Sequence, residues 1–139
     1  MSFNSFFARN KVKHPNIKYV ASPDFIDEET GKPEEWEIRK LGAKEADELK
    51  QSCMKPVKTG RTTTYELDTD AFSAKLAAAS IVYPNLKAAE LQNDWSVMGE
   101  ENLLKEMLSF GEYTMLVAKV TEHNGFNVPM NDLVEEAKN

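Results

Sequence analysis

Few residues in this chain have the types and spacing that catalysis or ligand binding requires. The nearest approach to a phosphate-binding loop is KTGRTTT, from Lys58 to Thr64. Such a loop needs glycines that let backbone N–H groups surround the phosphates, and a lysine that reaches them. Here the first glycine is missing, and Arg61 follows Gly60 where the lysine belongs. We therefore expect a mobile polar loop rather than a nucleotide site.

The acidic residues also lack the arrangement that a metal ion requires. The run DEETG, from Asp27 to Gly31, has neither the alternating oxygen ligands nor the bidentate glutamate of a calcium loop. It is more typical of a solvated turn. Asp68 and Asp70 are sufficiently explained by capping of the helix that follows them. We expect no metal site and no cofactor.

The histidines and the cysteine give no clear catalytic arrangement. His14 and His123 lie far apart, and neither has neighbours suited to metal binding or proton transfer. Cys53 is the only cysteine, which excludes an internal disulfide and a multi-cysteine zinc site. It lies on the apolar side of a predicted helix, which favours a buried, inert thiol over a Cys–His pair formed by the fold. Nothing in the sequence therefore argues for an enzyme.

Composition narrows the classes of partner. The chain has 139 residues, of which 41% are hydrophobic and 29% charged, as in one ordinary globular domain. Its net charge of −6 disfavours nucleic acid, because that binding depends on clustered Lys and Arg that neutralise phosphates. No apolar run is long enough for a signal peptide or a membrane span, so we expect no membrane partner and a cytosolic protein.

The hydrophobic pattern predicts an α+β fold that is mainly α, with an N-terminal β-hairpin followed by a cluster of short helices. Residues 1–16 form a basic and aromatic arm, residues 17–125 a single α+β domain, and residues 126–139 a tail that can hold a short helix. The hairpin covers residues 17–41, and its loose acidic loop contains Gly31 and Pro33.

Helical spacing then continues almost to the end of the domain. The predicted helices cover residues 43–54, 70–83, 87–95, 100–110 and 112–123, and residues 65–67 can add a third strand. Asp68 or Thr69 is suited to cap the second of these helices, and Asn124–Gly125 is a C-terminal stop for the last.

The stretch VMGEENLLKEMLSFGEYTMLVAKV, residues 97–120, has the outline of a helix-turn-helix with Gly111 near the joint. Residues 95–125 contain five acidic residues and only two Lys, and this net negative charge repels the phosphates of DNA. A recognition helix should offer Arg, Lys, Asn or Gln to the bases, whereas this one offers Met115, Leu116 and Val117. Packing or protein binding is favoured, and a small DNA-binding regulator remains the weaker alternative.

Methionines and aromatic residues supply the candidate protein-binding surface. Thioether side chains adapt to irregular partners, and short helices with apolar faces can form a groove for another helix. The same side chains can instead fill gaps in the core, as we expect for several of them. The candidate partner-facing residues are Phe6, Phe7, Trp95, Met98, Met107, Phe110 and Met115.

Three stretches also resemble a known family: ASPDFIDEETGKPEEWEIR, ELDTDAFSAKLAAASIVYPNLKAAELQ and VMGEENLLKEMLSFGEY. In their order and spacing they resemble the XkdN-like tail assembly chaperones of bacteriophages and defective prophages. The resemblance covers about residues 6–126, most of the chain. Its motifs are not catalytic signatures, and the family offers no catalytic residues to carry over.

The resemblance implies a non-enzymatic helper that acts in the cytoplasm of the bacterial host. It would bind the long, helical tape measure protein, with possible self-association along it, and keep it soluble until the tail tube polymerises around it. It also implies absence from the finished particle and, in many phages, a longer product made by a ribosomal frameshift near the end of the gene. The alternative is a structural tail component that stays in the virion.

Overall fold

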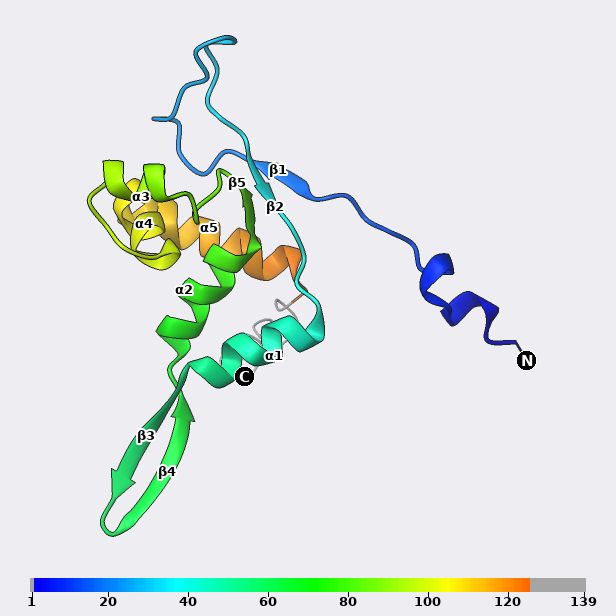
Figure 1. Ribbon diagram of the computed structural model, residues 1–139, viewed down its shortest axis with the longest axis vertical. Coiled ribbons are helices and arrows are strands. Elements are labelled where there is room, and N and C mark those ends of the chain that lie inside the picture. The colour runs from blue at the N-terminus through cyan, green and yellow to red at the C-terminus, as the bar shows by residue number, and fades with distance from the viewer. Residues whose placement is uncertain (1, 126–139) are drawn as a thin grey trace, which may run out of the picture.

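The computed structural model describes residues 2–125, and this part of the chain has the predicted α+β fold. Five α-helices, two short 3-10 helices and two small antiparallel sheets make up the regular structure of these residues. The helices gather around α2, while an N-terminal arm and a β-hairpin extend from this body in different directions (Figure 1). No helix within the described range is long and apolar enough to cross a membrane.

The predicted N-terminal hairpin is confirmed. Strand β1 (Ile17–Tyr19) pairs antiparallel with β2 (Trp36–Ile38), and Ile17 lies opposite Ile38. The acidic segment between them is tighter than the loose loop that we expected. The Asp27 amide donates to the Lys32 carbonyl at 2.8 Å, the Gly31 amide donates to the Asp27 carbonyl at 2.8 Å, and Ile26 and Pro33 form a β-bridge.

The third strand of this sheet, β5 (Ile81–Tyr83), lies where we predicted the end of a helix. Helix α2 (Thr69–Ser80) stops at Ser80, so the prediction of a helix over residues 70–83 was wrong in its last turn. Pro84 disfavours a helical conformation for the residue before it, and Ile81 and Val82 are β-branched. The open edge of β2 then supplies a partner, and the sheet order is β1–β2–β5.

The predicted mobile loop at residues 58–64 was also wrong, because these residues belong to a second hairpin. Strand β3 (Met54–Thr59) pairs with β4 (Thr62–Leu67) through a turn at Gly60 and Arg61. Gly60 has a φ of +65°, which suits a two-residue hairpin turn, and threonines favour strands. The predicted strand at residues 65–67 is part of β4 and does not join the first sheet.

The remaining helices lie close to their predicted positions. They are α1 (Ala43–Ser52), α3 (Ala89–Asp94), α4 (Glu100–Met107) and α5 (Phe110–His123). The joint between α4 and α5 is at Leu108 and Ser109, because Ser109 and Glu112 form a reciprocal capping box. Gly111, which we expected near the joint, lies in the first turn of α5. Asn124 and Gly125 follow the end of α5, as predicted.

Helix α2 is the centre of the core. Its buried Leu76 and Ala77 belong to one cluster with Leu103 and Leu104 of α4 and with Leu116 of α5, and the buried Trp36 and Ile38 of β2 complete that cluster. Asp68 caps α2 as predicted, by accepting a hydrogen bond from the Ala71 amide at 3.1 Å. Cys53 is buried, but it follows α1 rather than lying within it.

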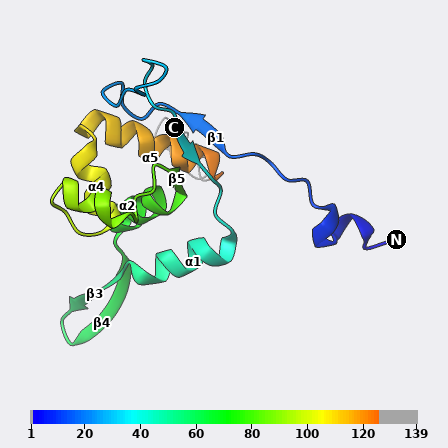
Figure 2. The same ribbon diagram turned by 45° about the horizontal axis from the view of Figure 1, so that its top comes forward.

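The N-terminal arm stands apart from this core. Its regular structure consists of two short 3-10 helices, η1 (Asn4–Phe6) and η2 (Ala8–Asn10). Both views show the arm leaving β1 and running away from the helices (Figures 1 and 2). The predicted tail at 126–139, with its possible short helix, lies outside the described residues.

Candidate partner-binding surface

The outward face of α5 is uncharged over two turns. Its exposed residues recur with helical spacing and are Phe110, Gly111, Thr114, Met115 and Ala118. The side chain of Phe110 is 87% exposed and that of Met115 is 62% exposed. A helix at a protein surface ordinarily turns polar residues toward water, so this uncharged face is a candidate surface for contact with another protein.

A groove beside this face lies between α5, α4 and α2. Its volume is about 670 Å³, and we call it the α2–α5 groove. It is lined by Asp70, Ser73, Lys105, Leu108, Ser109, Phe110, Tyr113, Thr114 and Val117. Tyr113 and Val117 also pack against the core, which fixes the floor of the groove to the body of the protein. The predicted candidate Phe110 thus belongs to both the outward face and the groove.

Of the other sequence-predicted candidates, three are exposed and two face inward. Met98, between α3 and α4, is 85% exposed, and Phe6 in the arm is 83% exposed. Phe7 is less exposed and lies under the Arg9 guanidinium, whose carbon is 4.7 Å from the ring centroid. Trp95 and Met107 are instead partly buried against the core.

Trp95 has a clear packing role. Its ring meets the Phe25 ring edge-on at 6.2 Å between centroids, and Phe25 is 6.5 Å from the buried Trp36. This row of aromatic rings connects the segment after α3 with the first hairpin and with the core.

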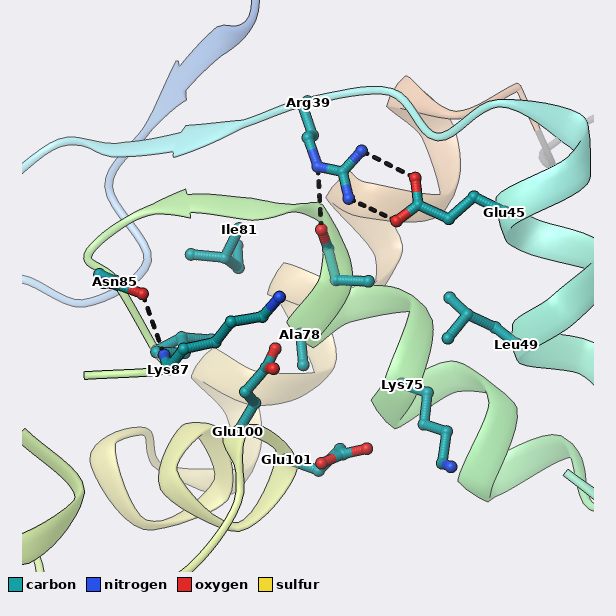
Figure 3. A pocket seen from close by; sticks show the side chains of 12 residues that line it. Arg39, Glu45, Leu49, Lys75, Ala78, Ile81, Asn85, Lys87, Glu100 and Glu101 are labelled. Carbon is teal, nitrogen blue, oxygen red and sulfur yellow. Dashed lines mark hydrogen bonds and ion pairs between the residues drawn. The ribbon is translucent and has the colours of Figure 1, made fainter. Parts of the chain in front are cut away.

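A second pocket, of about 410 Å³, is charged rather than apolar (Figure 3). Arg39 closes one side of it with two hydrogen bonds to the Glu45 carboxylate, at 2.9 and 2.7 Å, and its Nε donates to the Ala79 carbonyl at 3.1 Å. These bonds hold the pKa of Glu45 below its ordinary value and raise that of Arg39. Arg39 therefore links the end of β2 to α1 and α2 and stabilises the packing of these three elements.

The other charged groups at this pocket do not form a catalytic set. Lys75, Lys87, Glu100 and Glu101 line it, so positive and negative groups are mixed there (Figure 3). Within residues 2–125 no three His, Cys, Asp or Glu side chains come together as metal ligands would.

His123, one of the two histidines, is partly buried at the end of α5. Its Nε2 atom is buried and has no hydrogen-bond partner among the described residues. Burial lowers its pKa, and the positive charges of Lys40 and Lys119 lower it further. Both effects disfavour the charged form of the imidazole.

Comparison with known proteins identifies the family. The family model described as phage XkdN-like tail assembly chaperone protein matches residues 3–138. The chain belongs to this family. Tail assembly chaperones have protein partners in tail assembly and are generally not enzymes, which agrees with a surface that offers apolar contact rather than a reaction site.

Two relatives from Bacillus subtilis (strain 168) support this membership of the XkdN-like family. The uncharacterized protein YqbN is 34% identical, and the aligned region covers 97% of this chain and 92% of YqbN. The protein XkdN of the phage-like element PBSX is 32% identical, and the aligned region covers 97% of this chain and 93% of XkdN. A crystal structure of YqbN superposes with a TM-score of 0.76 at 26% identity, over 90% of this chain and 97% of that chain.

Sequence reasoning missed part of the surface of this XkdN-like protein. Thr114 and Ala118 were not singled out, although Phe110, Thr114 and Ala118 recur every fourth residue without a charge. That repeat was a usable signal. Asp70 and Ser73, which bring α2 to the groove, had no such signal because they approach α5 only through the fold.

Proposed function

We propose that this tail assembly chaperone binds the tape measure protein in the bacterial cytoplasm and keeps it soluble until the tail tube forms around it. The observation that carries the proposal is the uncharged outward face of α5, with Phe110 and Met115 exposed beside the α2–α5 groove. A long helical partner can lay its apolar stripe on such a face, with contacts repeated every three or four residues.

The charge of the chain supports the same role. A net charge of −6 opposes aggregation of a protein that exposes several large apolar side chains. Exposed Met115 and Met98 have flexible thioether side chains, which adapt to the varied apolar surface of a long partner. Binding of this kind needs no bound cofactor.

A DNA-binding role receives less support from the same helices. The exposed residues at the start of α5 are Phe110, Gly111, Thr114 and Met115, whereas base reading requires Arg, Lys, Asn or Gln on the exposed side of the helix. A mobility-shift assay at physiological salt is the direct test of this alternative.

Co-expression with the tape measure protein of the same tail gene cluster tests the proposal. We expect the chaperone to raise the soluble fraction of that protein and to co-purify with it through a tag on the tape measure protein. The double variant F110S/M115S should reduce the recovered chaperone by about tenfold or more, because exposed anchor residues dominate such contacts. The matched control is Y65S, which removes an aromatic side chain of similar exposure, 68%, from β4.

Two results would count against the proposal. If the two proteins neither co-purify nor change each other's solubility, the partner is wrong; if Y65S and F110S/M115S lose binding equally, the surface is wrong. Mass spectrometry of purified particles separates the structural alternative, since a protein retained in the virion would be found there at a fixed copy number.

A further inference from the structure

The β3–β4 hairpin projects from the body of the protein and forms a sheet of its own. Both views show its two strands extending beyond α1 and α2 (Figures 1 and 2). Among the described residues, β3 and β4 pair only with each other. An isolated two-stranded hairpin is only marginally stable in water, and a third strand stabilises it. The hairpin therefore has both the free edges and the energetic reason to accept another strand.

The hydrogen-bonding pattern of the hairpin determines which backbone groups remain free. The Asp68 amide donates to the Cys53 carbonyl at 2.9 Å, so the residue pair at the base of the hairpin is hydrogen-bonded. Hydrogen-bonded and non-hydrogen-bonded pairs alternate along an antiparallel ladder. The non-hydrogen-bonded pairs, whose backbone N–H and C=O groups point outward, are therefore Met54–Leu67, Pro56–Tyr65 and Lys58–Thr63.

The two free edges of the hairpin differ in their ability to accept a strand. On β3 the middle outward position is Pro56, which has no N–H to donate and so interrupts that edge. On β4 both Thr63 and Tyr65 keep an outward N–H and C=O. Residues 62–65 are also exposed and uncharged, and threonine and tyrosine favour strands. An added strand therefore fits the edge of β4 and not that of β3.

The charge of the hairpin indicates the kind of partner. Its charged residues are Lys55, Lys58, Arg61 and Glu66, a net +2. This leaves 14 of the 17 Lys and Arg and 22 of the 23 acidic residues in the rest of the chain, a net −8. Two copies joined through their β4 edges would bring two positive hairpins together, and the edge strands of the first sheet, β1 and β5, have only three residues each. Charge and strand length therefore favour an acidic segment of another protein over a second copy.

We propose that an extended, acidic segment of another protein adds to the free edge of β4 as a third strand. The backbone groups of Thr63 and Tyr65 bond to this strand, and the exposed Tyr65 ring packs on one of its apolar side chains. Arg61 in the turn and Lys58 on the neighbouring strand attract its carboxylates. Such a partner differs in kind from the helical one proposed for α5, so this inference does not depend on the tape measure protein.

A titration of the isotope-labelled full chain with a designed peptide, followed by NMR, tests the contact. The probe is an end-blocked heptapeptide that alternates valine and glutamate, and its matched control has lysine in place of glutamate. We expect the largest amide shifts at Thr63 and Tyr65. The glutamate peptide should bind at least about tenfold more tightly than the lysine peptide, and this preference should shrink in about 0.5 M salt, which screens exposed charges.

Proline substitutions compare the two edges directly. T63P removes an outward N–H from β4 while leaving the pairing with β3 intact. It should weaken binding of the glutamate peptide by about tenfold or more, because one backbone hydrogen bond is lost and the proline ring obstructs the added strand. The control K58P makes the same change on the edge that Pro56 already interrupts, so it should bind the peptide as K58Q does. Circular dichroism verifies the fold of each variant.

A charge variant tests the partner chemistry without altering the edge. K58E/R61E changes the hairpin from net positive to net negative, so it should reverse the preference between the two peptides. This result decides the matter if T63P fails to fold.

Four results would overturn the proposal. They are the absence of shifts at β4 at the highest soluble peptide concentration, unchanged binding by T63P, binding of the lysine peptide or of a single-stranded oligonucleotide to the hairpin as tightly as the glutamate peptide, and shifts of Thr63 and Tyr65 with protein concentration alone. The last would assign the edge to a second copy. T63P leaves Phe110 and Met115 unchanged, so co-purification with the tape measure protein remains a separate test.

Discussion

Asn124 joins three segments that are far apart in the sequence, and its replacement should destabilise the fold strongly. Its Oδ1 accepts a hydrogen bond from the Leu41 amide at 2.7 Å. Its Nδ2 donates to the Ser80 hydroxyl at 3.3 Å and to the Val120 carbonyl at 2.9 Å. The side chain therefore ties the segment after β2 and the end of α2 to the last turn of α5.

The expected magnitude for N124A follows from these three bonds. A hydrogen bond contributes a net of roughly 1 kcal/mol, and a buried group left without a partner costs about as much again or more. Ser80 is fully buried, with 0% exposure, so its hydroxyl would lose a partner that water cannot easily replace. We expect N124A to lower the free energy of unfolding by about 3 kcal/mol, which corresponds to a fall of roughly 10 °C in Tm for a domain of this size.

Urea denaturation followed by circular dichroism measures this loss. The control is N16A, since Asn16 is exposed and its contact with Glu37 is long, at 3.5 Å; it should change stability by less than about 0.5 kcal/mol. The double variant N124A/S80A should be more stable than the sum of the two single effects, because it removes the stranded hydroxyl. If N124A and N16A are equally stable, or if the double variant is simply additive, the argument from Asn124 fails.

Three further predictions concern single side chains. S109A should lower the free energy of unfolding by about 1 kcal/mol, because it removes the cap of α5, and an unchanged denaturation midpoint would contradict the capping box. L104A should cost about 2–5 kcal/mol in the same measurement, since Leu104 is fully buried, whereas M98A, at an exposed position, should cost little. The pKa of His123 is lowered in the folded chain, so the unfolded chain binds a proton at this residue more readily. The free energy of unfolding therefore keeps the full contribution of His123 above the ordinary pKa of 6.5 and falls as the pH drops below that value. H123Q should therefore lose less stability than the wild type between pH 7.5 and about 5.5 in urea denaturation, and equal pH dependence would show that the fold does not lower the pKa of His123.

Elements stabilised by nearby residues were predictable from the sequence. Asp68 caps α2 by a bond to an amide three residues later, and the end of α5 before Asn124 and Gly125 was predicted for a similar local reason. The first hairpin was predictable from Gly31 and Pro33 between two apolar runs. The start of α5 also has a local signal, Ser109 followed by Glu112, which was passed over in favour of Gly111.

Elements that depend on a distant partner were not predictable in this way. Ile81–Tyr83 continues the helical spacing of α2; Pro84 and the β-branched residues disfavour a helix there, but the strand also needs the distant edge of β2 as its partner. The strands β3 and β4 are mostly exposed, so they lack the apolar alternation that marks a half-buried strand. Their pairing shows itself only in the turn at Gly60 and in the abundance of threonine.

The candidate binding surface likewise has features that the sequence predicts and features that depend on the tertiary structure. Sequence alone determined the types of residue available for binding, the acidic balance of the chain and the resemblance to XkdN-like chaperones, because these depend on residue identity and order. It did not separate Phe110 and Met115, which face outward, from Trp95 and Met107, which pack against the core. Only the tertiary structure decided that, because the exposure of an apolar side chain depends on whether other elements cover it. The α2–α5 groove has the same origin, since Asp70 and Tyr113 meet only when α2 and α5 pack together.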